Sequence, residues 1–209
     1  MDQFSDEFRA GLHDLMRWRR DVRHFSTDPV DPTLLSSCLD AMSLAPSVGL
    51  SEPWRILRVT SPEARAAALE NFTQANEQAL AGYAGDKAAL YASLKLAGMR
   101  EAPEQLAIYC DEATAKGAGL GAQSMPEMRR YSVVGAITLM WLAARAQGVG
   151  IGWVSVLDPV RLSRDLDAPK EWRLVAYLCL GWPKDVSVTP ELETKGWEVR
   201  APALHIETR

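Results

Sequence analysis

The segment EMRRYSVVGAITLMWLAARAQGVGIGWVSVL, residues 127–157, indicates the fold class most directly. Its first part has apolar residues at helical spacing and predicts a helix. This part ends at Gly148, and glycine is common just past a helix C-terminus. Its second part, residues 149–157, is rich in β-branched and aromatic residues and predicts a strand. The most apolar window, residues 131–144, is shorter than the roughly 20 residues needed to span a bilayer, so we expect a buried helix rather than a membrane helix.

Helix and strand patterns continue on both sides of this segment. Asp31-Pro32 and Ser61-Pro62 each pair an N-cap residue with a proline at the first helical position. Further helices are predicted at residues 4–18, 87–97 and just after Asp158-Pro159, and further strands at residues 54–60, 105–110 and 172–181. Residues 111–126 hold three glycines and little periodicity, so they predict a loop or flap. No repeat or low-complexity linker divides the chain, and we expect one domain over residues 1–209 with a C-terminal arm from about residue 183.

The composition excludes several classes of function. The 23 basic and 27 acidic side chains give a net charge of −4, which argues against a general nucleic-acid binder. The three histidines are too scattered for a zinc motif, and the acidic N-terminus lacks the apolar region of a signal peptide. Cys38, Cys110 and Cys179 lie in apolar runs without a CxxC pair, which favours a reducing, cytoplasmic location. We therefore expect no metal site, no nucleic-acid partner and no membrane association.

Four arginines occur within the seven residues RWRRDVR, residues 17–23. Such a concentration of cations favours binding of an anion, because the planar guanidinium matches phosphate oxygens. The alternative is a solvated helix end whose arginines interact with the helix dipole. In isolation, Asp21 is most simply explained as an ion-pair partner of these arginines.

Two glycine series and one serine are weaker signals. The glycines in residues 117–121 and 148–152 have GxGxG spacing rather than the GxGxxG of a dinucleotide-binding turn, so a structural role is favoured for both. Ser155 follows Gly-Trp-Val but lacks the second glycine of a GxSxG nucleophile motif. A hydroxyl at a strand end can still contact a ligand, although a structural role is again the simpler interpretation.

Seven segments together resemble one protein family. They are RWRRDVRHF (17–25), LAPSVGLSEPWR (44–55), YASLKLAG (91–98), MPEMRRYSVVGAI (125–137), MWLAARAQG (140–148), GIGWVSVLDP (150–159) and LVAYLCLGWP (174–183). On these motifs the chain resembles the flavin-destroying branch of the nitroreductase-like proteins over nearly its whole length. The resemblance implies an α+β, nitroreductase-like FMN-binding fold, with a mostly antiparallel sheet flanked by helices. It also implies an intertwined homodimer whose C-terminal arms pack on the partner subunit.

The same resemblance implies an activity. In this branch reduced FMN is a substrate, and O2 is used to fragment it into 5,6-dimethylbenzimidazole, the lower ligand of cobalamin, and erythrose 4-phosphate. The reduced FMN would come from a separate flavin reductase. The alternatives are a conventional NAD(P)H-dependent FMN nitroreductase or flavin reductase, and a non-catalytic flavin-binding protein. Asp21, which stands where ordinary nitroreductases have a serine, and the GWVS motif at residues 152–155 argue against the conventional nitroreductase.

The resemblance also assigns roles to individual residues. Asp21 and Ser155 are the expected catalytic residues, Asp21 for proton transfer at the ribityl chain and Ser155 for orienting the flavin. The expected FMN-binding residues are Arg19, Arg20, Asp21, Arg23, Pro46, Ser47, Val48, Gly49, Val154, Ser155, Leu180, Gly181 and Arg200. Of these, the arginines would hold the phosphate and ribityl chain, and residues 46–49 would reach the flavin from the partner subunit.

Two departures from the family pattern stand out. Leu50-Ser51-Glu52 replaces an aromatic residue, a methionine and a glutamine, and residues 95–98 lack an expected glutamate. A carboxylate at position 52 near a flavin would disfavour the anionic reduced form of the ring. These departures concern contacts to the ring and not the fold.

Overall fold

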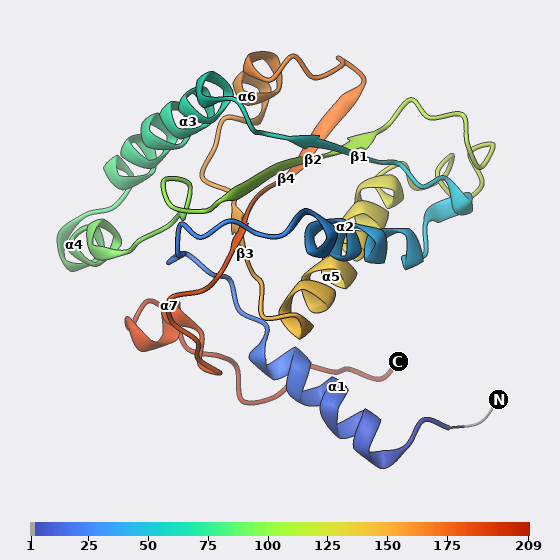
Figure 1. Ribbon diagram of the computed structural model, residues 1–209, viewed down its shortest axis with the longest axis horizontal. Helices are drawn as coiled ribbons and strands as arrows, with labels where there is room; N and C mark the ends of the chain where they lie inside the picture. Colours follow the sequence, from blue (N-terminus) through green and yellow to red (C-terminus); the bar gives the residue numbers. More distant parts are fainter. Residues whose placement is uncertain (1–2) are drawn as a thin grey trace.

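The computed structural model describes residues 3–209 and is built around a four-stranded antiparallel sheet in the order β1-β2-β4-β3 (Figure 1). The strands are β1 Trp54–Arg58, β2 Glu104–Asp111, β3 Gly150–Val154 and β4 Trp172–Gly181. β2 and β4 are the central pair, and almost all of β2 is buried. The predicted antiparallel sheet is confirmed.

Helices cover both faces of this sheet (Figure 1). They are α1 Asp6–Trp18, α2 Pro32–Asp40, α3 Pro62–Ala81, α4 Gly85–Ser93, α5 Met128–Ala146, α6 Pro159–Asp165 and α7 Glu191–Thr194, with two 3-10 turns, η1 Ala41–Leu44 and η2 Val48–Leu50. Alternate residues of β2 point to opposite faces. Leu106 and Ile108 join the core formed with α2 and α5, whereas Ala107 and Tyr109 join the core formed with α3 and α6.

Local sequence signals account for most element boundaries. The side chains of Asp31, Ser61 and Asp158 each accept hydrogen bonds from backbone N–H groups of the helix that they cap. α5 ends before Gly148, whose φ of 81° is the left-handed conformation that favours glycine. The predicted helix 87–97 is too long, because Leu94 adopts an extended conformation and α4 ends at Ser93.

The chain after β4 turns back across its own N-terminal part. The Ser26 N–H donates to the Trp182 carbonyl at 2.8 Å, and the Lys184 N–H donates to the His24 carbonyl at 3.0 Å. The last residues, 198–209, are exposed. The first half of the predicted arm therefore lies on its own chain, and the end of the arm is exposed to solvent.

Two further predictions concern composition. Cys38, Cys110 and Cys179 are buried free thiols, as their apolar surroundings in the sequence suggest. Among residues 3–209, no helix is both long enough and apolar enough to cross a bilayer.

Candidate functional site

The arginine-rich segment leaves α1 at Trp18 and runs along the outer edge of β3. Asp21 forms a parallel bridge with Ile151, and the Val22 N–H donates to the Ile151 carbonyl at 3.0 Å. Only glycine fits at position 152, since a Cβ there would lie 2.1 Å from the Val22 carbonyl oxygen. The glycines of residues 148–152 thus end a helix and admit a neighbouring backbone, as the structural interpretation predicted.

Asp21 is held from two sides. Its Oδ1 accepts a hydrogen bond from the Trp153 N–H at 2.7 Å, and its Oδ2 pairs with Arg23 Nε at 2.9 Å. The Arg23 guanidinium also donates to the Lys95 carbonyl at 3.3 Å, and its side chain is 12% exposed. The Asp21 side chain is 34% exposed, so the carboxylate is fixed in place and still open to solvent. Two bonds on different oxygens leave it little freedom to rotate.

Arg19, Arg20, Asp21, Arg23 and Arg200 line a pocket of about 140 Å³. Residues 190–192 of the C-terminal arm form its remaining wall. Three of the four arginines of residues 17–23 are therefore brought together with the predicted Arg200, which lies 177 residues beyond Arg23 in the chain, whereas Arg17 does not line this pocket.

Positive charge in this pocket is only partly compensated. Burial lowers the pKa of Arg20, and the neighbouring charges of Arg200, Arg19 and Arg17 lower it further. Arg23 pairs with Asp21, but within residues 3–209 no carboxylate forms an ion pair with Arg19, Arg20 or Arg200. Glu191 also lines the pocket, and the charge of Glu193 partly reverses the lowering of the Arg20 pKa, but the four arginines outnumber the carboxylates of the pocket. Such an excess of positive charge is the arrangement expected of a site for a phosphate dianion. A phosphate monoester such as that of FMN fits this donor set.

Arg19 has a partner that the sequence did not predict. Its guanidinium lies over the ring of Trp141 of α5, 4.8 Å from the ring centroid. Trp141 in turn packs beside Trp153 of β3. The helical spacing of α5 could have suggested that Trp141 faces inward, but nothing in the sequence indicates that it would meet Arg19.

Val154 and Ser155 lie at the C-terminal end of β3, where Val154 is buried and Ser155 is exposed. The Asp21 carboxylate is hydrogen-bonded to the backbone of Trp153, two residues before Ser155. Asp21 and Ser155 therefore both lie near the C-terminal end of β3. Leu180 and Gly181, in contrast, are buried in β4 beside β3, and neither lines the arginine pocket.

Residues 46–49 lie elsewhere on the chain, well away from α7 in Figure 1. The Val48 N–H donates to Ser132 Oγ of α5 at 3.0 Å, and the Glu52 N–H donates to Ser47 Oγ at 3.0 Å. Gly49 has a φ of 58°, and none of residues 46–49 lines the arginine pocket of the same chain.

The loop at residues 46–52 is packed against the flap at residues 111–126. A Cβ on Gly117 would lie 2.3 Å from the Gly49 carbonyl oxygen, so the two backbones touch where neither has a side chain. Glu52 forms an ion pair with Lys116 of the flap. The glycines of residues 117–121 therefore serve packing, again as the structural interpretation predicted.

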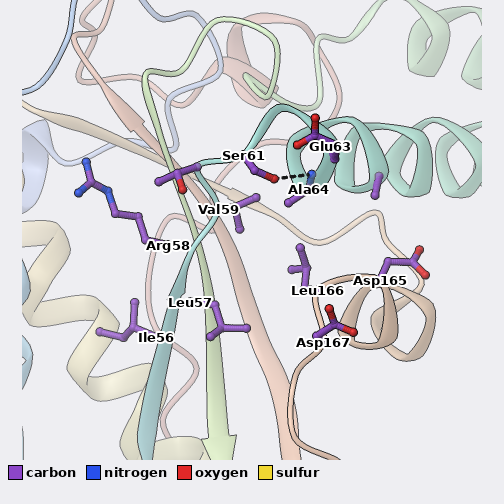
Figure 2. A pocket seen from close by; sticks show the side chains of 12 residues that line it. Ile56, Leu57, Arg58, Val59, Ser61, Glu63, Ala64, Asp165, Leu166 and Asp167 are labelled. Atoms are coloured by element: carbon purple, nitrogen blue, oxygen red, sulfur yellow. Dashed lines mark hydrogen bonds between the residues drawn. The ribbon is translucent and has the colours of Figure 1, made fainter.

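A larger pocket of about 630 Å³ lies between β1, α3 and α6, along the free edge of β1 (Figure 2). Ser61 in its wall accepts a hydrogen bond from the Ala64 N–H as the N-cap of α3. Its arginine, Arg58, is already paired with both carboxylate oxygens of Glu104. None of the predicted site residues lines this pocket, and its other charged residues, Glu63, Asp165 and Asp167, are acidic, so it lacks the features of a phosphate site.

The chain was compared with known proteins. The Nitroreductase family model matches residues 16–182. The "5,6-dimethylbenzimidazole synthase" of Rhodospirillum rubrum is 53% identical over 199 residues, which cover 95% of this chain and 94% of that protein. The protein of the same name from Rhodobacter capsulatus is 46% identical and covers 95% of this chain and 96% of its own length.

Solved structures agree on the fold. An iodotyrosine deiodinase, crystallised with FMN and 3-iodo-L-tyrosine, superposes with a TM-score of 0.72 at 21% identity, covering 95% of this chain and 97% of that one. A nitroreductase family protein from Clostridium novyi superposes with a TM-score of 0.64 at 18% identity, covering 83% and 86% of the two chains. At these identities the likeness extends to the fold alone.

Proposed function

The chain belongs to the nitroreductase family and its function is the synthesis of 5,6-dimethylbenzimidazole; we propose that it makes this compound by oxygen-dependent fragmentation of reduced FMN. Three relatives that carry the name of this activity are 44–53% identical over 95% of the chain. The structural observation that supports FMN as the substrate is the pocket of arginines closed by Asp21 and the C-terminal arm.

The proposed ligand places its phosphate among Arg19, Arg20, Arg23 and Arg200, whose positive charges a dianion would offset. The ring and ribityl chain then extend toward Val154 and Ser155 at the end of β3. Bound reduced FMN supplies the electrons that activate O2 and the carbon skeleton of both products, dimethylbenzimidazole and erythrose 4-phosphate. A separate flavin reductase in the cytoplasm supplies the reduced flavin, and the reaction uses no metal.

Asp21 is the proposed proton acceptor at the ribityl chain. The Trp153 N–H and the Arg23 guanidinium orient its two oxygens and hold the carboxylate in one position. A carboxylate positioned in this way contributes about 10²–10⁴-fold to a proton-transfer step. The Ser155 hydroxyl, exposed at the end of the same strand, orients the flavin.

We also propose that the active unit is a homodimer. Residues 46–49 do not line the arginine pocket of their own chain, which supports a flavin contact supplied by these residues of a partner subunit. α1 carries an exposed apolar stripe of Phe8, Leu12 and Met16 at helical spacing, and none of its residues is buried. Exposed apolar stripes of this kind mark interaction surfaces.

The end of the C-terminal arm is the second part of the proposed interface. Leu204 and Ile206 are 86% and 80% exposed, and both follow Arg200, which still lines the arginine pocket of its own chain. Light scattering during size-exclusion chromatography tests the proposal, with a chain shortened after Ala201 as the comparison. We expect a dimer for the full chain and a weaker dimer for the shortened one, and a monomeric full chain would contradict the assignment.

Product analysis after one aerobic turnover tests the activity. Chemically reduced FMN is mixed with the protein in air, and the products are separated by chromatography. We expect dimethylbenzimidazole from the wild type and none from Asp21→Asn, although this variant should bind oxidised FMN within a few-fold of the wild-type affinity. Ser155→Gly should show the same pattern.

Two outcomes would contradict these assignments. Intact FMN together with steady NAD(P)H oxidation by nitroaromatic compounds would indicate the conventional nitroreductase instead. Wild-type product rates in both variants would show that the roles given to Asp21 and Ser155 are wrong.

A further inference from the structure

The guanidinium of Arg20 is occupied by the main chain. Its Nε donates to the Val188 carbonyl at 2.9 Å, and its Nη2 donates to the same oxygen. Its Nη1 donates to the Arg19 carbonyl at 2.6 Å. All three nitrogens thus have protein acceptors, whereas Arg19 and Arg200 have no hydrogen bond of this kind among the described residues.

Val188 belongs to the part of the arm that closes the arginine pocket. It lies two residues before Pro190, and residues 190–192 form one wall of the pocket. The arm has other contacts on both sides of this point. The Lys184 N–H is bonded to the His24 carbonyl, Glu191 lies 3.5 Å from the His24 ring, and Lys87 Nζ donates to the Trp197 carbonyl at 3.0 Å. Of these contacts, only the long one from Glu191 lies closer to the wall than the bonds from Arg20 to Val188.

Arg20 also stands between two cavities. The arginine pocket lies on one side, and a second pocket of about 410 Å³, lined by His13, Arg17 and Glu193 among others, lies on the other. Arg20, Pro190 and Arg200 line both. Turning the Arg20 guanidinium toward a ligand would break its bonds to Val188 and open the partition between the cavities.

We propose that Arg20 is a positioning residue that fixes the C-terminal arm at Val188 and thereby places Arg200 and the residue 190–192 wall over the phosphate pocket. The phosphate is then contacted by Arg19, Arg23 and Arg200, and Arg20 acts on it through the arm. This inference rests on the proposed binding of FMN in this pocket. Because binding and arm closure are linked, a phosphate that contacts Arg200 must also stabilise the closed arm.

The test separates the arm from the ligand. Hydrogen–deuterium exchange of residues 186–200 is measured in the flavin-free protein for the wild type, Arg20→Met, Arg20→Lys and the control Arg19→Met. We expect Arg20→Met to speed exchange in this segment about 10-fold, because hydrogen bonds from a charged donor are lost. Arg20→Lys should restore part of the protection, and Arg19→Met should leave it unchanged. Unchanged exchange in β2 shows that the fold is intact.

Affinities for oxidised FMN and riboflavin, measured by flavin fluorescence, provide the second readout. Arg20→Met should weaken FMN binding about 10-fold and leave riboflavin binding unchanged, since only FMN carries the phosphate. Weaker FMN binding by Arg20→Met with normal exchange of residues 186–200 would indicate that Arg20 contacts the phosphate directly, and this result would overturn the proposal. Faster exchange with an unchanged FMN-to-riboflavin affinity ratio would also overturn it.

The wild-type affinities distinguish failure of this inference from failure of the site. If the wild type binds FMN no more tightly than riboflavin, the phosphate pocket itself is wrongly assigned. The exchange of residues 186–200 in Arg20→Met would still show whether Arg20 holds the arm.

Discussion

Substitution of Gly152 by alanine tests how tightly the arginine-rich segment is held against β3. A Cβ at this position would lie 2.1 Å from the Val22 carbonyl oxygen, whereas ordinary contacts begin at 3.4 Å. The segment would therefore have to move away by roughly 1 Å, which costs about 1–3 kcal/mol as overpacking. The movement would also stretch the 2.7 Å bond from the Trp153 N–H to Asp21, a charged hydrogen bond whose loss costs about 1.5–3 kcal/mol.

Because the two effects share one displacement, they do not add fully, and we expect Gly152→Ala to lower the free energy of unfolding by about 3 kcal/mol. Urea denaturation followed by tryptophan fluorescence measures this change. Gly135→Ala is the matched control, since a Cβ at position 135 of α5 meets no atom within 4 Å and alanine favours a helix by up to ~1 kcal/mol. If Gly152→Ala unfolds within about 0.5 kcal/mol of the wild type, the segment is not packed against β3 as described.

Three further predictions follow from the site and the core. Arg200→Met should weaken binding of oxidised FMN about 10-fold without affecting riboflavin, as measured by fluorescence titration. Gly117→Ala should lower the free energy of unfolding by about 1–3 kcal/mol in urea denaturation, because the new Cβ would lie 2.3 Å from the Gly49 carbonyl oxygen and φ at position 117 is 81°. Burial raises the pKa of Cys110 from 9.0 to about 11 and that of Cys179 to about 12. Since the unfolded thiols lose their protons first, their contribution to stability should be constant below about pH 9 and should fall between pH 9 and 11. Urea denaturation at a series of pH values measures this change, and a rise over this interval would contradict the burial of these thiols.

Elements whose signals are local were predictable from the sequence. α5 and the strand after it follow from apolar periodicity and from Gly148, and three helix starts follow from capping residues. The end of α4 was not predictable, because the apolar pattern continues through Leu94 although the backbone there is extended. Periodicity reports which residues could face a core, but packing decides where the helix stops.

Contacts between distant parts of the chain account for the rest. The bond from Arg20 to Val188 joins residues 168 positions apart, and the arm that contains Val188 has no periodicity to predict its path. The sequence suggested an anion site from the arginines alone, because like charges close together need a counter-charge. It could not show that one of these arginines is bound to the main chain.

Glu52 shows how one substitution can be offset by a residue far along the chain. Seen alone in the sequence, its carboxylate predicts an unfavourable field for an anionic flavin. In the fold it pairs with Lys116 of the flap, and the pair is half-exposed, so its net field on a neighbouring group is small. The close contact between Gly49 and Gly117 is what brings the two loops near enough to pair. The unusual acid and the glycine-rich flap are therefore one structural feature: the flap that fixes the backbone of residues 46–52 also supplies the cation that offsets Glu52.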